Sequence, residues 1–166
     1  MRMVLAVLVL SAASLSATRS DTADSEPVAI YQIVNDSIPK PLDGLAGDPA
    51  RGRAIVAGRA GNCLACHHAP IPEEPFHGDL GPPLEGIGDR ATAGALRLRL
   101  VAPRTLNPDT VMPAFHQVDG LRRVAPQHRG RPLLTAQEVE DVIAYLLTQR
   151  ADGRKRKSSL HTISVA

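Results

Sequence analysis

Two cysteines and a histidine stand within five residues of one another, at Cys63, Cys66 and His67. The pattern Cys-x-x-Cys-His is the attachment signature of a c-type haem. Two thiols can add across the two vinyl groups of a porphyrin, and a two-residue gap gives them the separation that the vinyl groups require. His67 would then lie under the iron and bind it through an imidazole nitrogen. The motif predicts one covalently bound haem c, attached through Cys63 and Cys66, with His67 as an iron ligand.

Three other uses of the motif stay open at this point. A dithiol redox pair would use both cysteines, but a thioredoxin-like motif needs a βαβ setting and none is visible nearby. A structural zinc site could use Cys63, Cys66, His67 and His68. Zinc sites, however, usually draw two pairs of ligands from separated segments. A plain disulfide would explain the cysteines but not the histidine. We therefore prefer the haem.

A second iron ligand is expected at Met112, the only methionine after the first three residues. An electron-transfer haem needs a second axial ligand, and a thioether raises its potential relative to a second histidine. Pro108 and Pro113 stiffen the loop that would carry the sulfur. The rival ligands are three histidines, each of which we expect at the surface: His77, His116 and His128.

A glycine- and proline-rich stretch, residues 81–90, can turn closely around a bulky group. An iron-bound imidazole needs an acceptor for its other ring N–H. We expect a carbonyl oxygen of Pro82 or Pro83 to accept from His67. Three arginines follow in the chain, and we expect each to be solvated at the surface, with pairing to haem propionates or contact with a partner as the alternatives: Arg97, Arg99 and Arg104.

Composition and charge indicate one domain with extensions. The 166 residues include no Trp, two Phe and two Tyr, so the core would gain from a large apolar insert such as a haem. The net charge is +2, but four basic residues lie in the segment 154–157, and residues 18–150 carry −2. The high isoelectric point therefore comes from the tail and does not indicate a nucleic-acid partner.

The first 17 residues resemble a secretory signal peptide, with one early Arg, an apolar run and then small residues. The apolar run is too short to span a membrane, although an uncleaved anchor is the alternative. Export would place the mature chain, without a membrane span, in the periplasm, where bacteria attach c-type haem. We divide the chain into a signal peptide (1–17), an extended leader (18–46), a haem domain (47–150) and a basic, disordered tail (151–166).

Three helices are predicted within the haem domain. One begins at the N-cap Asp48 and ends near Gly58, and its small residues would let another helix approach closely. Another covers residues 91–101. The clearest runs from residue 135 to 150, with a capping box of Thr135 and Glu138 and one apolar face. The leader is either a flexible linker or an arm that wraps a partner.

The order of these motifs resembles class I cytochrome c: Cys-x-x-Cys-His, Gly-Pro-x-Leu-x-Gly, a Met-Pro loop and a final amphipathic helix. The likeness extends to the SoxX family, the c-type cytochrome subunits of bacterial thiosulfate oxidation. The segments that carry it are residues 37–42, 47–52, 61–67, 107–108, 112–115 and 133–142. It covers roughly residues 37–147, most of the mature chain.

This resemblance implies an all-α, class I cytochrome c fold, with a few helices and long loops around one covalently bound haem. It makes Cys63 and Cys66 the attachment points, His67 the proximal ligand and Met112 the distal ligand. It also implies three partners: a SoxA-like haem subunit, a SoxYZ-like sulfur carrier and a small soluble cytochrome c that accepts electrons. The chain would be the electron-transfer subunit of L-cysteine S-thiosulfotransferase. The alternative is a free-standing class I electron shuttle.

The chain itself is not expected to carry catalytic residues. With both cysteines occupied by haem, no thiol remains to bond to sulfur, and no Ser-His-Asp or metal-hydrolase pattern appears. The sequence therefore predicts electron transfer within a complex rather than bond formation with thiosulfate.

Overall fold

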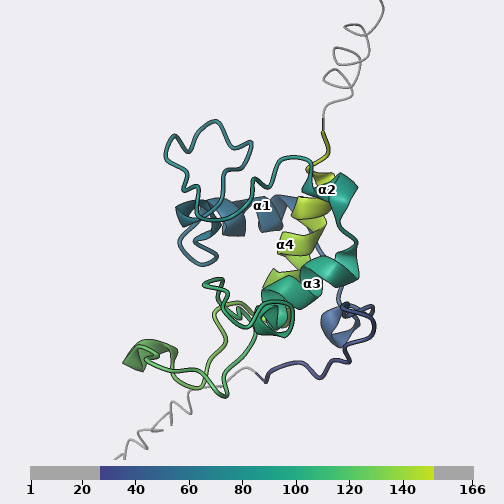
Figure 1. The fold of residues 1–166 in the computed structure, drawn as a ribbon, viewed down its shortest axis with the longest axis vertical. Coiled ribbons are helices and arrows are strands. Elements are labelled where there is room, and N and C mark those ends of the chain that lie inside the picture. Colours follow the sequence, from purple (N-terminus) through teal and green to yellow (C-terminus); the bar gives the residue numbers. More distant parts are fainter. Residues whose placement is uncertain (1–26, 152–166) are drawn as a thin grey trace, which may run out of the picture.

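The structure is a computed structural model that describes residues 27–151. The expected signal peptide and nearly all of the basic tail lie outside these residues. The described part is helical and has no β-strand (Figure 1). Its α-helices are α1 (Pro49–Ala57), α2 (Ile87–Arg90), α3 (Ala93–Val101) and α4 (Ala136–Thr148). Its 3₁₀ turns are η1 (Leu42–Gly44), η2 (Cys63–Ala65), η3 (Pro103–Thr105) and η4 (Pro126–His128).

Helix α1 begins and ends as predicted. The side chain of Asp48 accepts hydrogen bonds from the backbone N–H groups of Ala50 (2.7 Å) and Arg51 (3.0 Å). Pro49 occupies the first helical position, and Gly58 is the C-cap. These caps satisfy backbone groups that the helix itself leaves without partners.

Helices α1 and α4 cross with their backbones in contact. A Cβ atom on Gly52 would overlap the carbonyl oxygen of Asp141 and lie 2.9 Å from the Cβ of Tyr145. A Cβ on Gly47 would likewise overlap the carbonyl oxygen of Glu140. The expected close approach of another helix to α1 is therefore confirmed, and glycine is what allows it.

Helix α4 forms the centre of the core. Its capping box is present, because Thr135 Oγ1 accepts from Glu138 N (3.1 Å) and Glu138 Oε2 accepts from Thr135 N (2.8 Å). The apolar face is buried at Val139, Val142, Ile143 and Leu146. Burial of each such side chain contributes about 1.5–3 kcal/mol. Among the described residues, no helix is long and apolar enough to cross a membrane.

The described part of the leader lies along its own domain. Ala29, Ile38 and Leu42 are buried in the common core, and Ile38 N donates to Gly94 O (3.0 Å). We call residues 27–46 the arm. A Cβ on Gly94 would overlap Ser37 Oγ, so the arm and α3 are also in close contact. Residues 27–46 are therefore packed against their own domain and are not a free linker; contact of this arm with a partner stays a prediction.

A buried ion pair joins α3, α4 and this arm. Arg97 and Glu140 are 2% and 4% exposed, and the guanidinium donates from Nε (2.6 Å) and Nη2 (2.7 Å) to the two carboxylate oxygens. Arg97 also donates to Ile38 O, and Leu42 N donates to Glu140 Oε1. The expectation that Arg97 is solvated or faces a propionate was wrong, because a glutamate on the inner face of α4 takes up its charge.

Candidate haem site

The Cys-x-x-Cys-His motif forms one tight turn directly after α1. Asn62 adopts a left-handed backbone (φ 48°) and leads into η2. The carbonyl oxygen of Cys63 then accepts from Cys66 N (3.1 Å) and from His67 N (2.9 Å). This turn brings Cys63, Cys66 and His67 together, with all three half-buried. Two thiols and one imidazole on a single turn are the groups that covalent haem attachment needs.

The three other uses of the motif find little support in this geometry. Both cysteines are free thiols rather than a disulfide. No cluster of three or more His, Cys, Asp or Glu that could hold a metal ion occurs in residues 27–151. Burial, with a smaller contribution from Cys66, raises the pKa of the Cys63 thiol to about 11. Redox-active cysteines have lowered pKa values instead.

Three backbone hydrogen bonds hold a second segment against the motif. They run from Gly78 N to Leu64 O (2.8 Å), from Gly81 N to Cys66 O (2.7 Å) and from Leu84 N to His68 O (2.8 Å). Residues 78–84 therefore follow the motif closely along its length. We call this segment the proximal loop.

The proximal loop places a carbonyl oxygen on His67. Nδ1 of His67 lies 2.7 Å from Pro82 O. A carbonyl oxygen only accepts hydrogen bonds, so Nδ1 carries the proton and Nε2 keeps its lone pair for a metal. The expectation of an acceptor at Pro82 or Pro83 is confirmed at Pro82. This tautomer fits the axial ligand of a haem iron.

Glycines in and beside the motif leave room for the reactive side chains. A Cβ on Gly81 would lie 2.6 Å from His67 Nδ1 and 2.8 Å from Nε2, and would overlap the ring at Cε1. A Cβ on Gly61 would come within 3.2 Å of Cys63 Sγ. The backbone thus comes into direct contact with the imidazole ring, which suits a ligand held in one orientation.

Arg90 secures the far end of the proximal loop. Its guanidinium donates from Nη1 to Glu85 O (2.8 Å) and from Nη2 to Pro83 O (2.9 Å). It comes from α2, a four-residue helix that the sequence did not predict within the glycine-rich stretch. Arg90 therefore supports the loop that carries the acceptor of His67, a role that a single arginine in the sequence does not signal.

Met112 lies on a different segment, the loop after α3. The side chain of Asn107 accepts from Asp109 N (3.1 Å), and Thr110 Oγ1 accepts from Met112 N (3.2 Å). Phe115 N then donates to Leu100 O (2.8 Å), which ties the end of this loop to α3. Met112 is half-buried against the core. In the described chain, no hydrogen bond joins this loop to the cysteine motif.

His116 is a structural residue of the core and not a rival ligand. Its side chain is 1% exposed, Ala29 N donates to Nε2 (2.9 Å), and Nδ1 donates to Leu134 O (2.9 Å). Both ring nitrogens are therefore in use. The expectation of a surface position was wrong, because the arm covers this histidine. His128 is exposed, as expected.

His77 lies beside the motif and keeps one nitrogen without a partner. Its ring contacts His68 edge-on, with centroids 4.9 Å apart, and Nδ1 accepts weakly from Ala69 N (3.4 Å). Nε2 is buried and has no hydrogen-bond partner within the described residues. A buried polar atom without a partner is costly. It leaves a hydrogen-bonding position open for a polar group of a cofactor beside the motif.

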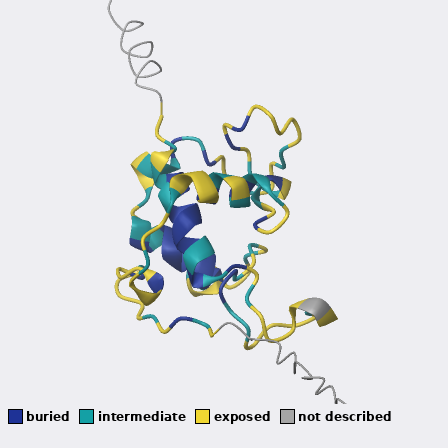
Figure 2. Cartoon of the chain, turned by 180° about the vertical axis from the view of Figure 1, so that it is seen from behind, coloured by how far each residue is buried: buried dark blue, intermediate teal, exposed yellow. Residues whose placement is uncertain are grey.

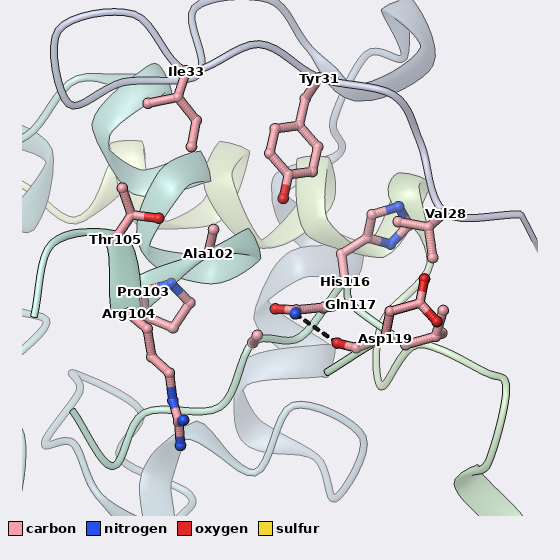
Figure 3. Close-up of a pocket in the computed structure, with 12 residues that line it drawn as sticks. Val28, Tyr31, Ile33, Ala102, Pro103, Arg104, Thr105, His116, Gln117 and Asp119 are labelled. Carbon is pink, nitrogen blue, oxygen red and sulfur yellow. Dashed lines mark hydrogen bonds between the residues drawn. The ribbon is translucent and has the colours of Figure 1, made fainter. Parts of the chain in front are cut away.

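A pocket of about 440 Å³ lies elsewhere, between the arm, η3 and residues 114–119 (Figure 3). Tyr31, Arg104 and His116 are among its lining residues. The two attachment cysteines and the two predicted iron ligands, His67 and Met112, are not among its lining residues, so we treat it as separate from the candidate haem site.

Comparison with known proteins agrees with this geometry. The family model for cytochrome c matches residues 49–150. A chain in the crystal structure of SoxXA from P. pantotrophus is 37% identical, with a TM-score of 0.66, and the match covers 74% of the present chain and 94% of that chain. No curated protein matches significantly. The fold is that of class I cytochrome c, and the family's cofactor is covalently bound haem c. The chain therefore belongs to the cytochrome c family, as a SoxX-like electron-transfer cytochrome.

Proposed function

We propose that this chain is the electron-transfer cytochrome subunit of an L-cysteine S-thiosulfotransferase of the SoxAX type. One observation carries the proposal: the 37% identity to a SoxXA chain over 94% of that chain. The match covers 74% of the present chain and so extends beyond the residues matched by the family model. A general likeness to cytochrome c domains would not require the match to extend beyond residues 49–150.

The residues divide the work of holding the cofactor. Cys63 and Cys66 would form the two thioethers, and His67, through Nε2, and Met112, through its sulfur, would bind the iron. When bound, the haem supplies a one-electron carrier. Pro82 fixes the orientation of His67 and, by accepting its Nδ1 proton, makes the imidazole a more basic ligand. A methionine sulfur favours a higher potential than a second histidine would.

The sulfur chemistry belongs to a partner. The chain contains two cysteines, and both are assigned to the haem. No thiol is left to bond to thiosulfate, so a SoxA-like haem subunit would carry that step. Joining thiosulfate to a cysteine of a SoxYZ-like carrier releases two electrons. The present chain accepts them one at a time and passes them to a small soluble cytochrome c.

The proposed location is the periplasm. The supporting observation is the signal-peptide pattern of residues 1–17, which lie outside the described part of the structure. Two free thiols and a haem must meet outside the cytoplasm for attachment in bacteria, so this location and the haem motif support each other.

The test is reconstitution with the candidate partner and carrier from the same organism. The oxidised holoprotein is mixed with both proteins and with thiosulfate. Haem reduction is followed by absorbance and carrier modification by mass spectrometry. We expect the carrier to gain one thiosulfate, and the reduced haem bands to appear, only when the partner is present.

A second arm separates this proposal from a free-standing shuttle. The holoprotein is co-expressed with the partner and passed over a sizing column. Co-elution as a one-to-one pair supports the proposal. A stable monomer, together with carrier modification that proceeds at the same rate without this chain, would contradict it.

A further inference from the structure

A long loop leaves the domain and returns at one base, close to Met112. Its two ends are joined by hydrogen bonds from Leu134 N to Phe115 O (2.8 Å) and from His116 Nδ1 to Leu134 O (2.9 Å). Phe115 is three residues from Met112 in the chain. Figure 1 shows the loop, in green and including η4, projecting away from the four α-helices.

The projecting part carries a concentration of positive charge. It contains four arginines and no carboxylate between residues 120 and 132: Arg122, Arg123, Arg129 and Arg131. All four are exposed. Figure 2 shows the projecting loop mostly in yellow, the colour of exposed residues. Within residues 27–151, none of their side chains forms an ion pair or a hydrogen bond. The nearest acid in the sequence, Asp119, stands at the base. We call residues 120–132 the arginine loop.

The rest of the domain has the opposite charge. Residues 18–150 contain 14 basic and 16 acidic side chains. Without the four arginines of the loop, ten basic residues remain against sixteen acidic ones, a net charge of −6. The overall charge near zero therefore conceals a strong separation of charge, which can orient the protein as it approaches a partner.

The arginine loop also has a defined path. Its backbone takes left-handed conformations at Gly120, Arg123 and Gly130, and η4 forms a turn within it. Backbone hydrogen bonds from His128 N to Ala125 O (2.9 Å) and from Arg131 N to His128 O (3.3 Å) add to this order. The arginines are thus presented on a shaped surface.

We propose that the arginine loop is the docking surface for an acidic electron-accepting protein, an inference that rests on the proposed electron-transfer function. Guanidinium groups pair with carboxylates through two parallel hydrogen bonds, which gives orientation as well as attraction. Leu121, which is 38% exposed and lies beside Arg122 in the chain, adds an apolar group to this surface.

The charge pattern favours a protein over other polyanions. A nucleic acid or an anionic membrane extends beyond one loop and would also face the rest of residues 27–150, whose nine basic and thirteen acidic side chains give a net charge of −4 that repels it. Single-stranded nucleic acid further needs aromatic stacking platforms, and the chain has only two Phe and two Tyr. A compact acidic patch on a protein avoids both difficulties.

The test uses the oxidised holoprotein and labelled poly-L-glutamate as the acidic polypeptide. Affinity is measured by fluorescence anisotropy at several salt concentrations for two double variants, R122Q/R129Q and R123Q/R131Q. The matched control is R59Q/R99Q, which removes the same charge from two exposed arginines elsewhere. We expect each loop variant to weaken binding about tenfold at low salt and the control less than twofold. Haem spectra and unfolding curves confirm that each variant is folded.

A second readout links the loop to electron transfer. The reduced holoprotein is oxidised by ferricyanide, an anion, and by a cationic cobalt complex. In the loop variants, oxidation by ferricyanide should be several-fold slower and oxidation by the cobalt complex several-fold faster. The control variant should change neither rate much. Equal effects of loop and control variants would overturn the proposal, as would tighter arginine-dependent binding to phosphatidylglycerol vesicles or to DNA. Neither assay uses thiosulfate, so failure of the sulfur-pathway assignment would be seen separately.

Discussion

The imidazole ring of His67 packs directly on the backbone of Gly81, where a Cβ atom would lie 2.6 Å from Nδ1. The neighbouring carbonyl oxygen of Pro82 accepts a hydrogen bond from Nδ1–H of His67, with 2.7 Å between Nδ1 and the oxygen. These two contacts fix both the position and the tautomer of the proposed proximal ligand. The proximal loop therefore contributes to the haem site although none of its residues is assigned to bind iron.

Gly81→Ala should disturb this arrangement. The added methyl group overlaps the ring, so either His67 or the proximal loop must shift, at a cost of about 1–3 kcal/mol in the free energy of unfolding. A weaker hydrogen bond to Pro82 makes the imidazole less basic and should raise the reduction potential. Leu80→Ala, at an exposed position next to Gly81 in the same loop, is the control. Redox titration would show equal potentials for both variants if the contact had no influence on the iron.

Met112→Ala should remove the distal ligand. The weak sulfur-to-iron absorption band in the near infrared should disappear, and the potential should fall by on the order of 0.1 V, since axial ligands set haem potentials over a span of about 0.8 V. His128→Ala, at an exposed histidine that was a rival ligand, serves as the control and should keep the band. If the band persists in Met112→Ala, another residue is the sixth ligand.

Arg97→Ala should destabilise the protein strongly. The substitution leaves the Glu140 carboxylate buried without its partner, which costs about 3–5 kcal/mol. It also removes the hydrogen bond that Arg97 donates to the carbonyl oxygen of Ile38 in the arm. Arg99→Ala, two residues along α3 but exposed, should change stability by less than about 0.5 kcal/mol. The measurement is urea unfolding of the holoprotein, and similar midpoints for the two variants would contradict the inferred role of the ion pair.

Asp141 should make stability depend on acid pH. Burial alone would raise its pKa, but hydrogen bonds from Arg51, the backbone N–H of Asp48 and Gln137 outweigh this and hold the pKa below its ordinary value of 3.8. A carboxylate with a lowered pKa in the folded state stabilises the fold above the pKa of the unfolded chain. That contribution is lost as the pH falls through the folded-state value. The free energy of unfolding should therefore decrease below about pH 4.

Asp141→Asn tests this dependence. At pH 7 the variant should lose about 1–3 kcal/mol, because its amide replaces a charged acceptor of several hydrogen bonds. Its stability should also fall less between pH 5 and pH 2.5 than that of the unaltered protein. Asp79→Asn, at an exposed site, is the matched control. An acid dependence that survives in Asp141→Asn would assign the effect to other carboxylates.

The features predicted correctly from the sequence are those set by neighbouring residues. The N-caps Asp48 and Thr135 signal the starts of α1 and α4 because a cap acts within three residues of itself. The acceptor of His67 follows from a glycine- and proline-rich stretch that can turn against a ring. The roles of Cys63, Cys66 and His67 in holding the haem stay predictions, which rest on the local spacing of the motif.

The features that the sequence did not reveal depend on residues far apart in the chain. Arg97 is buried because Glu140, 43 residues later, receives its charge. His116 is buried because Ala29, 87 residues earlier, covers and donates to it. Burial of an arginine or a histidine is decided by such distant partners, and no local pattern records them. The cluster of four arginines is visible in the sequence. That it lies on a loop whose two ends are joined by hydrogen bonds is visible only in the structure.

The most direct test of the account is a mass measurement on the exported protein. Trypsin should release the peptide from Ala60 to Arg90, which contains Cys63, Cys66 and His67. We expect this peptide to be heavier by one haem and neither cysteine to react with iodoacetamide. A peptide of unmodified mass that takes up two alkyl groups would contradict this expectation.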